Sequence, residues 1–235
     1  MESANRVVVA LDYDNEQDVY ALVAQLDASK CRLKVGKELF TYCGPQLVKD
    51  LTSRGFDVFL DLKFHDIPNT VAKAVKAAAD LGVWMVNVHV SGGAEMMRRS
   101  AEIIADHPNR PLLIGVTVLT STAQSDLDEL DIRGDIKDRV LAYARLAKQS
   151  GLDGVVCSAQ EAPVIRKALG DDFILVTPGI RPVGANADDQ HRIVTPGDAI
   201  SDGSSYLVVG RPITKADNPL ESLDKINTEV ELALK

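Results

Sequence analysis

The sequence has little that would suit a secreted or membrane-bound protein. Its three cysteines are odd in number, widely spaced and flanked by apolar residues, which is typical of reduced thiols rather than of a disulfide framework. No apolar run approaches the roughly 20 residues of a membrane-spanning helix. Residues 1–6 carry neither an apolar signal core nor a basic amphipathic pattern. We therefore expect a cytoplasmic protein in which Cys31, Cys43 and Cys157 are unpaired.

Basic residues are fewer than acidic ones. The chain has 26 Lys and Arg against 34 Asp and Glu, which gives a formal net charge of -8. No block of Lys and Arg occurs that could follow a nucleic-acid backbone or an anionic lipid surface. We expect neither nucleic acid nor a membrane as a partner.

Several motifs that would indicate other chemistry are missing. No GxGxxG follows the first predicted strand, and the Walker phosphate loop and the GxSxG elbow are absent. The four histidines lack the HExxH motif and paired metal-ligand spacing, so we expect no metal. His107 and His191 are expected in solvent. His89 is either a satisfied polar residue of the protein interior or a site residue.

The residues that are present alternate between short β-rich runs and longer helical stretches, eight times in succession. With 46% hydrophobic and 26% charged residues, the composition is that of an ordinary globular protein. Predicted strands cover 6–12, 31–36, the start of 57–70, 84–90, 112–119, 154–158, 173–177 and 206–210. Predicted helices cover 16–26, 45–53, 68–81, 94–105, 136–149, 162–169 and 219–234. Eight such units in 235 residues predict a single (β/α)8 barrel domain over 1–235, because a doubly wound sheet usually stops at five or six strands.

Charged residues stand at the end of the third predicted strand, where a buried strand should have none. Asp61 and Lys63 share a face because side chains two apart in a strand point the same way. Lys34 ends the second strand, so lysines and aspartates can alternate at the carboxyl-terminal mouth, where barrel active sites lie. The alternative for Asp61 and Lys63 is a purely structural ion pair, with Asp66 as an ordinary loop residue. The alternative for Lys34 is a position on the rim of the barrel without a role in the site.

A second group of residues suits an anionic ligand. Gly210 and Arg211 follow the eighth strand, and an arginine there can hold a phosphate through two hydrogen bonds. The facing loop after the seventh strand contains Pro178 and Arg181 and is rich in glycine and polar residues. Such a loop suits a lid over the ligand, and the alternative is a solvated surface loop.

The stretch Asp61-Leu62-Lys63-Phe64-His65-Asp66-Ile67-Pro68-Asn69-Thr70 is similar to the signature of the orotidine 5'-monophosphate decarboxylase family. One DxKxxD motif is modest support, but further segments resemble the family in the same order along nearly the whole chain. These segments are Ala10-Leu11-Asp12, Lys34-Val35-Gly36, 116–121, 177–181, 189–192 and 209–213.

The resemblance implies a cofactor-free decarboxylation of orotidine 5'-monophosphate (OMP) to UMP, in pyrimidine synthesis, by a homodimer with shared sites. It implies a catalytic set of Lys34, Asp61 and Lys63 from one subunit and Asp66 from the partner. It implies that Asp12 and Lys34 bind the ribose, with the help of Thr70 of the partner, and that Thr120 or Ser121 contacts the pyrimidine. Gln190, Gly210 and Arg211 would hold the phosphate, and Pro178 and Arg181 would also belong to the substrate-binding set. Lys63 would stabilise and then protonate a carbanion at C6, and Asp61 would lie near the departing carboxylate.

Two alternatives remain at this point. A magnesium-dependent sugar-phosphate decarboxylase or synthase of the same barrel superfamily shares the DxKxxD motif. Lys34 argues against it, because the resemblance implies an acidic metal ligand there in those relatives. A non-catalytic phosphate-binding barrel would keep Arg211 but would have no need of the lysine and aspartate array.

Overall fold

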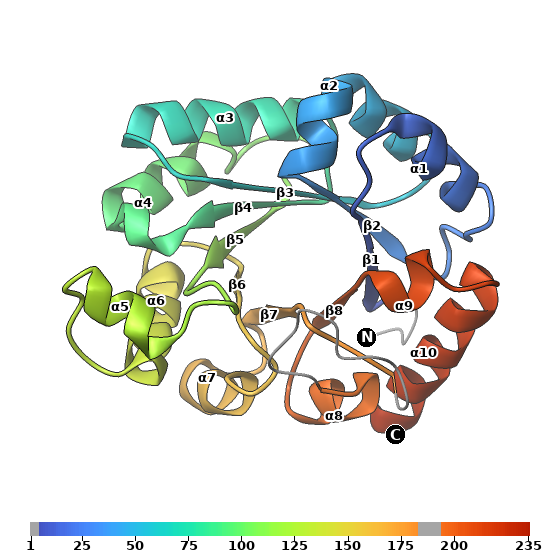
Figure 1. Cartoon of the computed structure of the whole chain (residues 1–235). Helices are drawn as coiled ribbons and strands as arrows, with labels where there is room; N and C mark the ends of the chain where they lie inside the picture. Colours follow the sequence, from blue (N-terminus) through green and yellow to red (C-terminus); the bar gives the residue numbers. More distant parts are fainter. Residues whose placement is uncertain (1–4, 183–193) are drawn as a thin grey trace.

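The computed structural model, which describes residues 5–182 and 194–235, is a closed barrel of eight parallel strands in sequence order. The strands are β1 (Val7–Leu11), β2 (Arg32–Gly36), β3 (Val58–Phe64), β4 (Met85–His89), β5 (Leu112–Val116), β6 (Gly154–Val156), β7 (Ile174–Thr177) and β8 (Tyr206–Val209). β1 pairs with β8 and closes the ring. The predicted (β/α)8 barrel is confirmed (Figure 1).

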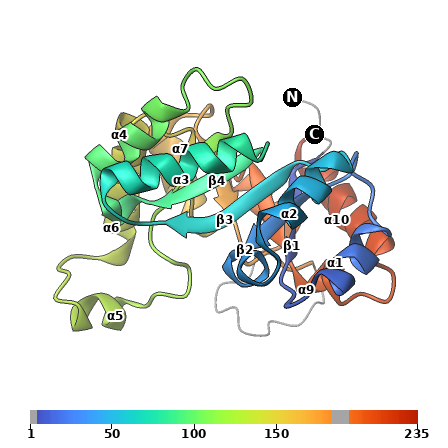
Figure 2. The same ribbon diagram turned by 90° about the horizontal axis from the view of Figure 1, so that it is seen from above.

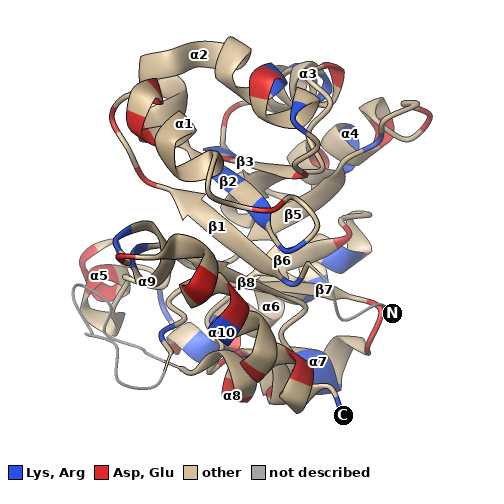
Figure 3. Ribbon diagram, turned by 90° about the vertical axis from the view of Figure 1, so that its right-hand side faces the viewer, with Lys and Arg blue, Asp and Glu red and all other residues tan. Residues whose placement is uncertain are grey.

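Helices surround the barrel and connect its strands (Figure 1). They are α1 (Glu16–Val23), α2 (Lys37–Ser53), α3 (Pro68–Asp80), α4 (Ala94–Ile103), α5 (Gln124–Glu129), α6 (Ile136–Gln149), α7 (Ala162–Leu169), α8 (Pro196–Ser201), α9 (Arg211–Thr214) and α10 (Pro219–Ala233), with a 3-10 turn η1 (Val90–Gly92). Figure 2 shows α5 standing apart from this ring. Both signs of charge are mixed on outer helices such as α3 and α10 (Figure 3).

The core has two layers because successive strand residues point to opposite faces. Val8 and Ala10 of β1 point into the barrel, where Phe59 and Met85 belong to the same cluster. The alternate residues of β1, such as Val9, pack outward against the helices. All five residues of β1 are buried, which explains its continuous apolar sequence.

Several predicted element bounds were wrong. Helical structure begins at Lys37 and not after Pro45, and Gly44 interrupts it with φ 68° and ψ −167°. Between β5 and α6, where the sequence pattern predicts no helix, the structure has α5, and α8 likewise precedes β8. These helices have six residues each, too few to show a helical period clearly. No helix of the described residues is both long and apolar enough to span a membrane.

Candidate active site

Four charged side chains of alternating sign form a chain at the carboxyl-terminal mouth of the barrel. Lys34 Nζ lies 3.2 Å from Asp12 Oδ1 and 3.5 Å from Asp61 Oδ2. Lys63 Nζ lies 2.7 Å from Asp61 Oδ1. The side chains of Lys34 and Asp61 are only 10% and 12% exposed, whereas that of Asp12 is 68% exposed. The inner charges depend on each other, because opposite charges offset the cost of leaving water.

Strand register brings these residues together. Ala10 of β1 pairs with Lys34 of β2, and Gly36 of β2 pairs with Asp61 of β3. Gly36 leaves room for the lysine, since a Cβ at this position would lie 3.3 Å from Lys34 Nζ. The three parallel strands thus deliver their polar ends to one point, as the sequence pattern predicts.

Asn87 of β4 is a further polar residue of this site, outside the predicted catalytic and substrate-binding sets. It is 0% exposed. Its Nδ2 donates a hydrogen bond to Asp61 Oδ1 at 2.7 Å, and its Oδ1 accepts one from the backbone N–H of Lys63 at 2.8 Å. A lone amide in the apolar strand Val86-Asn87-Val88 is itself a signal, because buried polar groups require partners.

His89 ends β4 beside the charged chain. Burial is the main cause that lowers its pKa to about 4, and the positive charges of His65, Lys37 and Lys63 act in the same direction. The ring centroids of His65 and His89 lie 5.5 Å apart. At neutral pH His89 is therefore an uncharged imidazole.

An apolar cavity of about 180 Å³ extends from the charged chain into the barrel. Its lining residues are Lys34, Phe59, Asp61, Lys63, Val116, Val118, Leu119, Thr120, Val156, Val176, Pro178 and Val208. Thr120 lines this cavity, whereas Ser121 is exposed beside it. A small, largely apolar group in this cavity would therefore lie close to both lysines.

A second cavity, of about 410 Å³, shares Lys34, Pro178 and Val208 with the first. It is lined by Ala10, Asp12, Tyr13, Lys34, Pro178, Gly179, Arg181, Val208, Gly210, Arg211, Thr214 and Lys215. Gly179 has φ 80°, a left-handed conformation that favours glycine. Arg181 is 5% exposed and donates to the carbonyl of Ile180 at 3.0 Å.

The substrate-binding residues predicted after the seventh and eighth strands thus fall into two groups. Gly210, Arg211, Pro178 and Arg181 all line the second cavity, so the structure brings them together around a space adjoining the charged chain. Gln190 lies outside the described residues.

Asp66 and Thr70 stand apart from the other candidates. Both are exposed at the start of α3. Within the described residues, the Asp66 carboxylate accepts a hydrogen bond from the N–H of Ile67 at 2.6 Å and forms no ion pair with Lys34 or Lys63 of its own chain. Ile67 is an exposed apolar neighbour, with 67% of its surface accessible.

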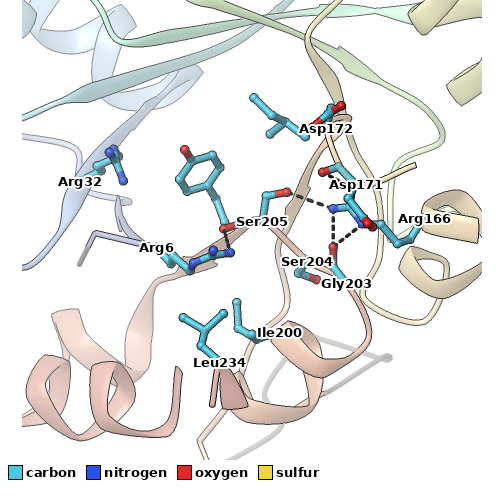
Figure 4. A pocket seen from close by; sticks show the side chains of 12 residues that line it. Arg6, Arg32, Arg166, Asp171, Asp172, Ile200, Gly203, Ser204, Ser205 and Leu234 are labelled. Atoms are coloured by element: carbon cyan, nitrogen blue, oxygen red, sulfur yellow. Dashed lines mark hydrogen bonds between the residues drawn. The ribbon is translucent and has the colours of Figure 1, made fainter. Parts of the chain in front are cut away.

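The opposite, amino-terminal mouth has a cavity of about 590 Å³ with three arginines, but they have structural partners (Figure 4). Arg32 pairs with Asp57 at 3.0 Å and covers the ring of Trp84 at 4.3 Å. Arg166 donates to the carbonyl of Gly203 at 2.6 Å. Arg6 donates to the carbonyl of Ser205 at 3.4 Å. These residues close the end of the barrel, and the candidate chemistry lies at the other end.

The chain is similar to known proteins over nearly its whole length. Residues 5–226 match the family described as "Orotidine 5'-phosphate decarboxylase / HUMPS family". The chain is similar to orotidine 5'-phosphate decarboxylase of Hahella chejuensis, with 60% identity over 231 residues, 98% of this chain and 99% of the relative. The protein of that name from Nitrosococcus oceani is 56% identical over 226 residues, 96% and 97% of the two chains. The crystal structure of the Lactobacillus acidophilus protein of that name has a TM-score of 0.86 and 40% identity, covering 95% of this chain and 98% of that one.

Proposed function

The chain belongs to the orotidine 5'-phosphate decarboxylase / HUMPS family, and from this premise we propose that it decarboxylates OMP to UMP without a cofactor, as a step of pyrimidine synthesis. The observation that carries the proposal is the alternating chain Asp12, Lys34, Asp61 and Lys63. It lies between an apolar cavity and a cavity with two arginines. A pyrimidine nucleotide has the matching order of a flat base, a ribose and a phosphate.

The two cavities support one orientation of the substrate. The pyrimidine enters the apolar cavity, with Thr120 or Ser121 at its polar edge. The ribose hydroxyls meet Asp12 and Lys34, where the two cavities join.

The phosphate then lies in the larger cavity. Arg211 and the backbone of Gly210 hold it, together with Gln190 of the loop after β7. Pro178 and Arg181 complete the wall of the substrate site, and Arg181 adds a second guanidinium to that cavity.

Lys63 carries the chemical step. The bond between C6 and the carboxyl carbon breaks, carbon dioxide leaves, and the electron pair remains on C6 with little delocalisation. A fixed ammonium group at C6 stabilises this charge as it develops, and its proton then passes to C6 to give UMP. Asp61 holds the ammonium at 2.7 Å, and Lys34 counters the charge of that carboxylate from its other oxygen.

Asp61 also lies near the departing carboxylate in this orientation. Repulsion between the two anions is relieved when carbon dioxide leaves, which contributes to the rate as ground-state destabilisation. We give more weight to stabilisation of the transition state by Lys63, because that attraction strengthens as negative charge develops on C6.

The site is completed by a second copy of the chain. We propose a homodimer, with residues 1–235 of each copy forming one domain, in which Asp66 and Thr70 enter the partner's site. Their exposure at the start of α3, beside the exposed Ile67, supports this assignment. Their exposure leaves these side chains accessible to a second chain, as the homodimer requires.

A magnesium-dependent reaction on a sugar phosphate is the alternative within the same family. The Lys34 ammonium, held between Asp12 and Asp61, favours the OMP reaction, because a divalent cation at these carboxylates would meet the charge of Lys34. The two reactions differ in their response to a chelator. We expect the purified protein to convert OMP to equal amounts of UMP and carbon dioxide, at the same rate with and without EDTA. Loss of turnover in EDTA, restored by magnesium, would support the alternative.

A further inference from the structure

Asn87 faces an irregularity in the strand that carries the charged pair. Leu60 of β3 pairs with Val86 of β4, and Phe64 pairs with Val88. Three residues of β3 therefore lie opposite the single residue Asn87. This arrangement is a β-bulge, which locally interrupts the backbone ladder and changes the direction of a side chain.

The bulge gives Lys63 an unusual backbone. Its φ is 51°, in the left-handed region that residues with a Cβ rarely adopt. The N–H of Lys63 turns to the side chain of Asn87, whose Oδ1 accepts it at 2.8 Å. Asn87 thus supplies the hydrogen bond that a regular ladder would have supplied.

The same amide also sets the rotation of the Asp61 carboxylate. Oδ1 accepts from Asn87 Nδ2 at 2.7 Å and from Lys63 Nζ at 2.7 Å. Oδ2 is thereby left for Lys34, at 3.5 Å. Each oxygen of the Asp61 carboxylate therefore contacts a different lysine, and the Asn87 amide shares Oδ1 with Lys63.

We infer that Asn87 is a positioning residue for the decarboxylation, a role that rests on the proposed function. Through one side chain it holds the backbone of Lys63 and the carboxylate of Asp61 in the arrangement that directs the ammonium toward C6. Asn87 is 0% exposed and lines neither cavity of the site, so it acts through these two residues and not on the substrate. Displacing a reacting group by about 1 Å can reduce a rate about a hundredfold.

The test separates this role from that of an ordinary buried amide. Asn87→Leu removes both hydrogen bonds, and Asn87→Asp keeps the acceptor but replaces the donor with a second carboxylate beside Asp61. Thr117→Val is the matched control, because Thr117 is 3% exposed, donates to the carbonyl of Val156 at 2.9 Å and does not contact the charged chain. For each variant, kcat with OMP, the Kd of UMP and the thermal midpoint are measured.

Both Asn87 variants should lose about a hundredfold or more in kcat while the Kd of UMP stays within about threefold, because the phosphate and ribose contacts remain. Thr117→Val should lose thermal stability and keep its kcat. A kcat of Asn87→Leu equal to that of the control would overturn the inference and leave the proposed function standing. If Asn87→Leu does not fold, Asn87→Ser, which keeps one hydroxyl in place of the amide, undergoes the same comparison. Absence of OMP turnover in the wild type would instead overturn the proposed function, and this inference with it.

Discussion

The ammonium group of Lys63 lies 2.7 Å from the carboxylate of Asp61, two residues earlier on the same strand. The pair is partly buried, with side chains 26% and 12% exposed. A buried ion pair contributes little to stability, because the cost of desolvation roughly equals the attraction. Its place at the mouth of the barrel fits the proposed chemistry on a bound substrate, because ionisable pairs in such places are candidates for function.

Arg211 is expected to bind the phosphate of the substrate. Arg211→Ala should weaken UMP binding about tenfold to a hundredfold, the usual effect of losing hydrogen bonds to a charged group. Binding of uridine, which has no phosphate, should not change. Arg110→Ala is the control, because Arg110 pairs with Asp153 at 3.0 Å and lines neither cavity of the site. Isothermal titration with both ligands measures the effect, and an equal loss for uridine would place Arg211 outside the phosphate site.

Asp66 is expected to serve the site of the partner subunit. Lys63→Ala and Asp66→Ala subunits, each inactive alone, should recover activity when mixed, because one site of each heterodimer collects both defects and the other collects none. Random exchange makes about half of the dimers mixed, so roughly a quarter of wild-type activity should return.

The control for this mixing experiment uses two residues of one subunit. Lys63→Ala mixed with Asp61→Ala should recover nothing, since every site then retains a defect. Native mass spectrometry verifies subunit exchange in both mixtures. If the Asp66→Ala mixture also recovers nothing after full exchange, Asp66 does not act across the interface.

His89 is expected to make the fold sensitive to acid. Its pKa is about 4 in the folded protein and near 6.5 when unfolded, so protonation favours the unfolded chain. Above pH 6.5 the neutral His89 ring does not reduce the free energy of unfolding. This free energy then decreases as the pH falls from 6.5 toward 4. After allowance for the partly exposed ring, the loss should be about 2 kcal/mol.

Urea unfolding of the wild type and of His89→Gln at several pH values measures this contribution. The variant should lose less stability than the wild type between pH 6.5 and 4, because glutamine does not titrate. If the free energy of unfolding falls by the same amount in both proteins over this pH range, burial of the His89 ring does not control the acid response.

The barrel and the charged chain could be predicted because both follow from local patterns. Eight alternations indicate the strand count, and the two-residue period of a strand puts Asp61 and Lys63 on one face. The bulge at Lys63 could not be predicted, since lysine carries no preference for a left-handed backbone. The link from Asn87 to Asp61 depends on the pairing of β4 with β3, which a single-strand pattern does not contain.

Asp66 and Thr70 mark another limit of prediction from one chain. Both are exposed at the start of α3, and the role that we propose for them depends on a second subunit. The helix α5 could not be predicted for a different reason. Its six residues do not cover two full turns, so they show no clear helical period.

The central claim, that Lys63 acts on the reacting carbon of OMP, is tested most directly by following the ultraviolet absorbance of OMP with wild type and Lys63→Ala side by side. The absorbance should fall with the wild type and remain constant with Lys63→Ala, while both proteins bind UMP with similar affinity, because the ammonium contacts C6 and not the phosphate. Near-normal turnover by a folded Lys63→Ala protein would contradict the account.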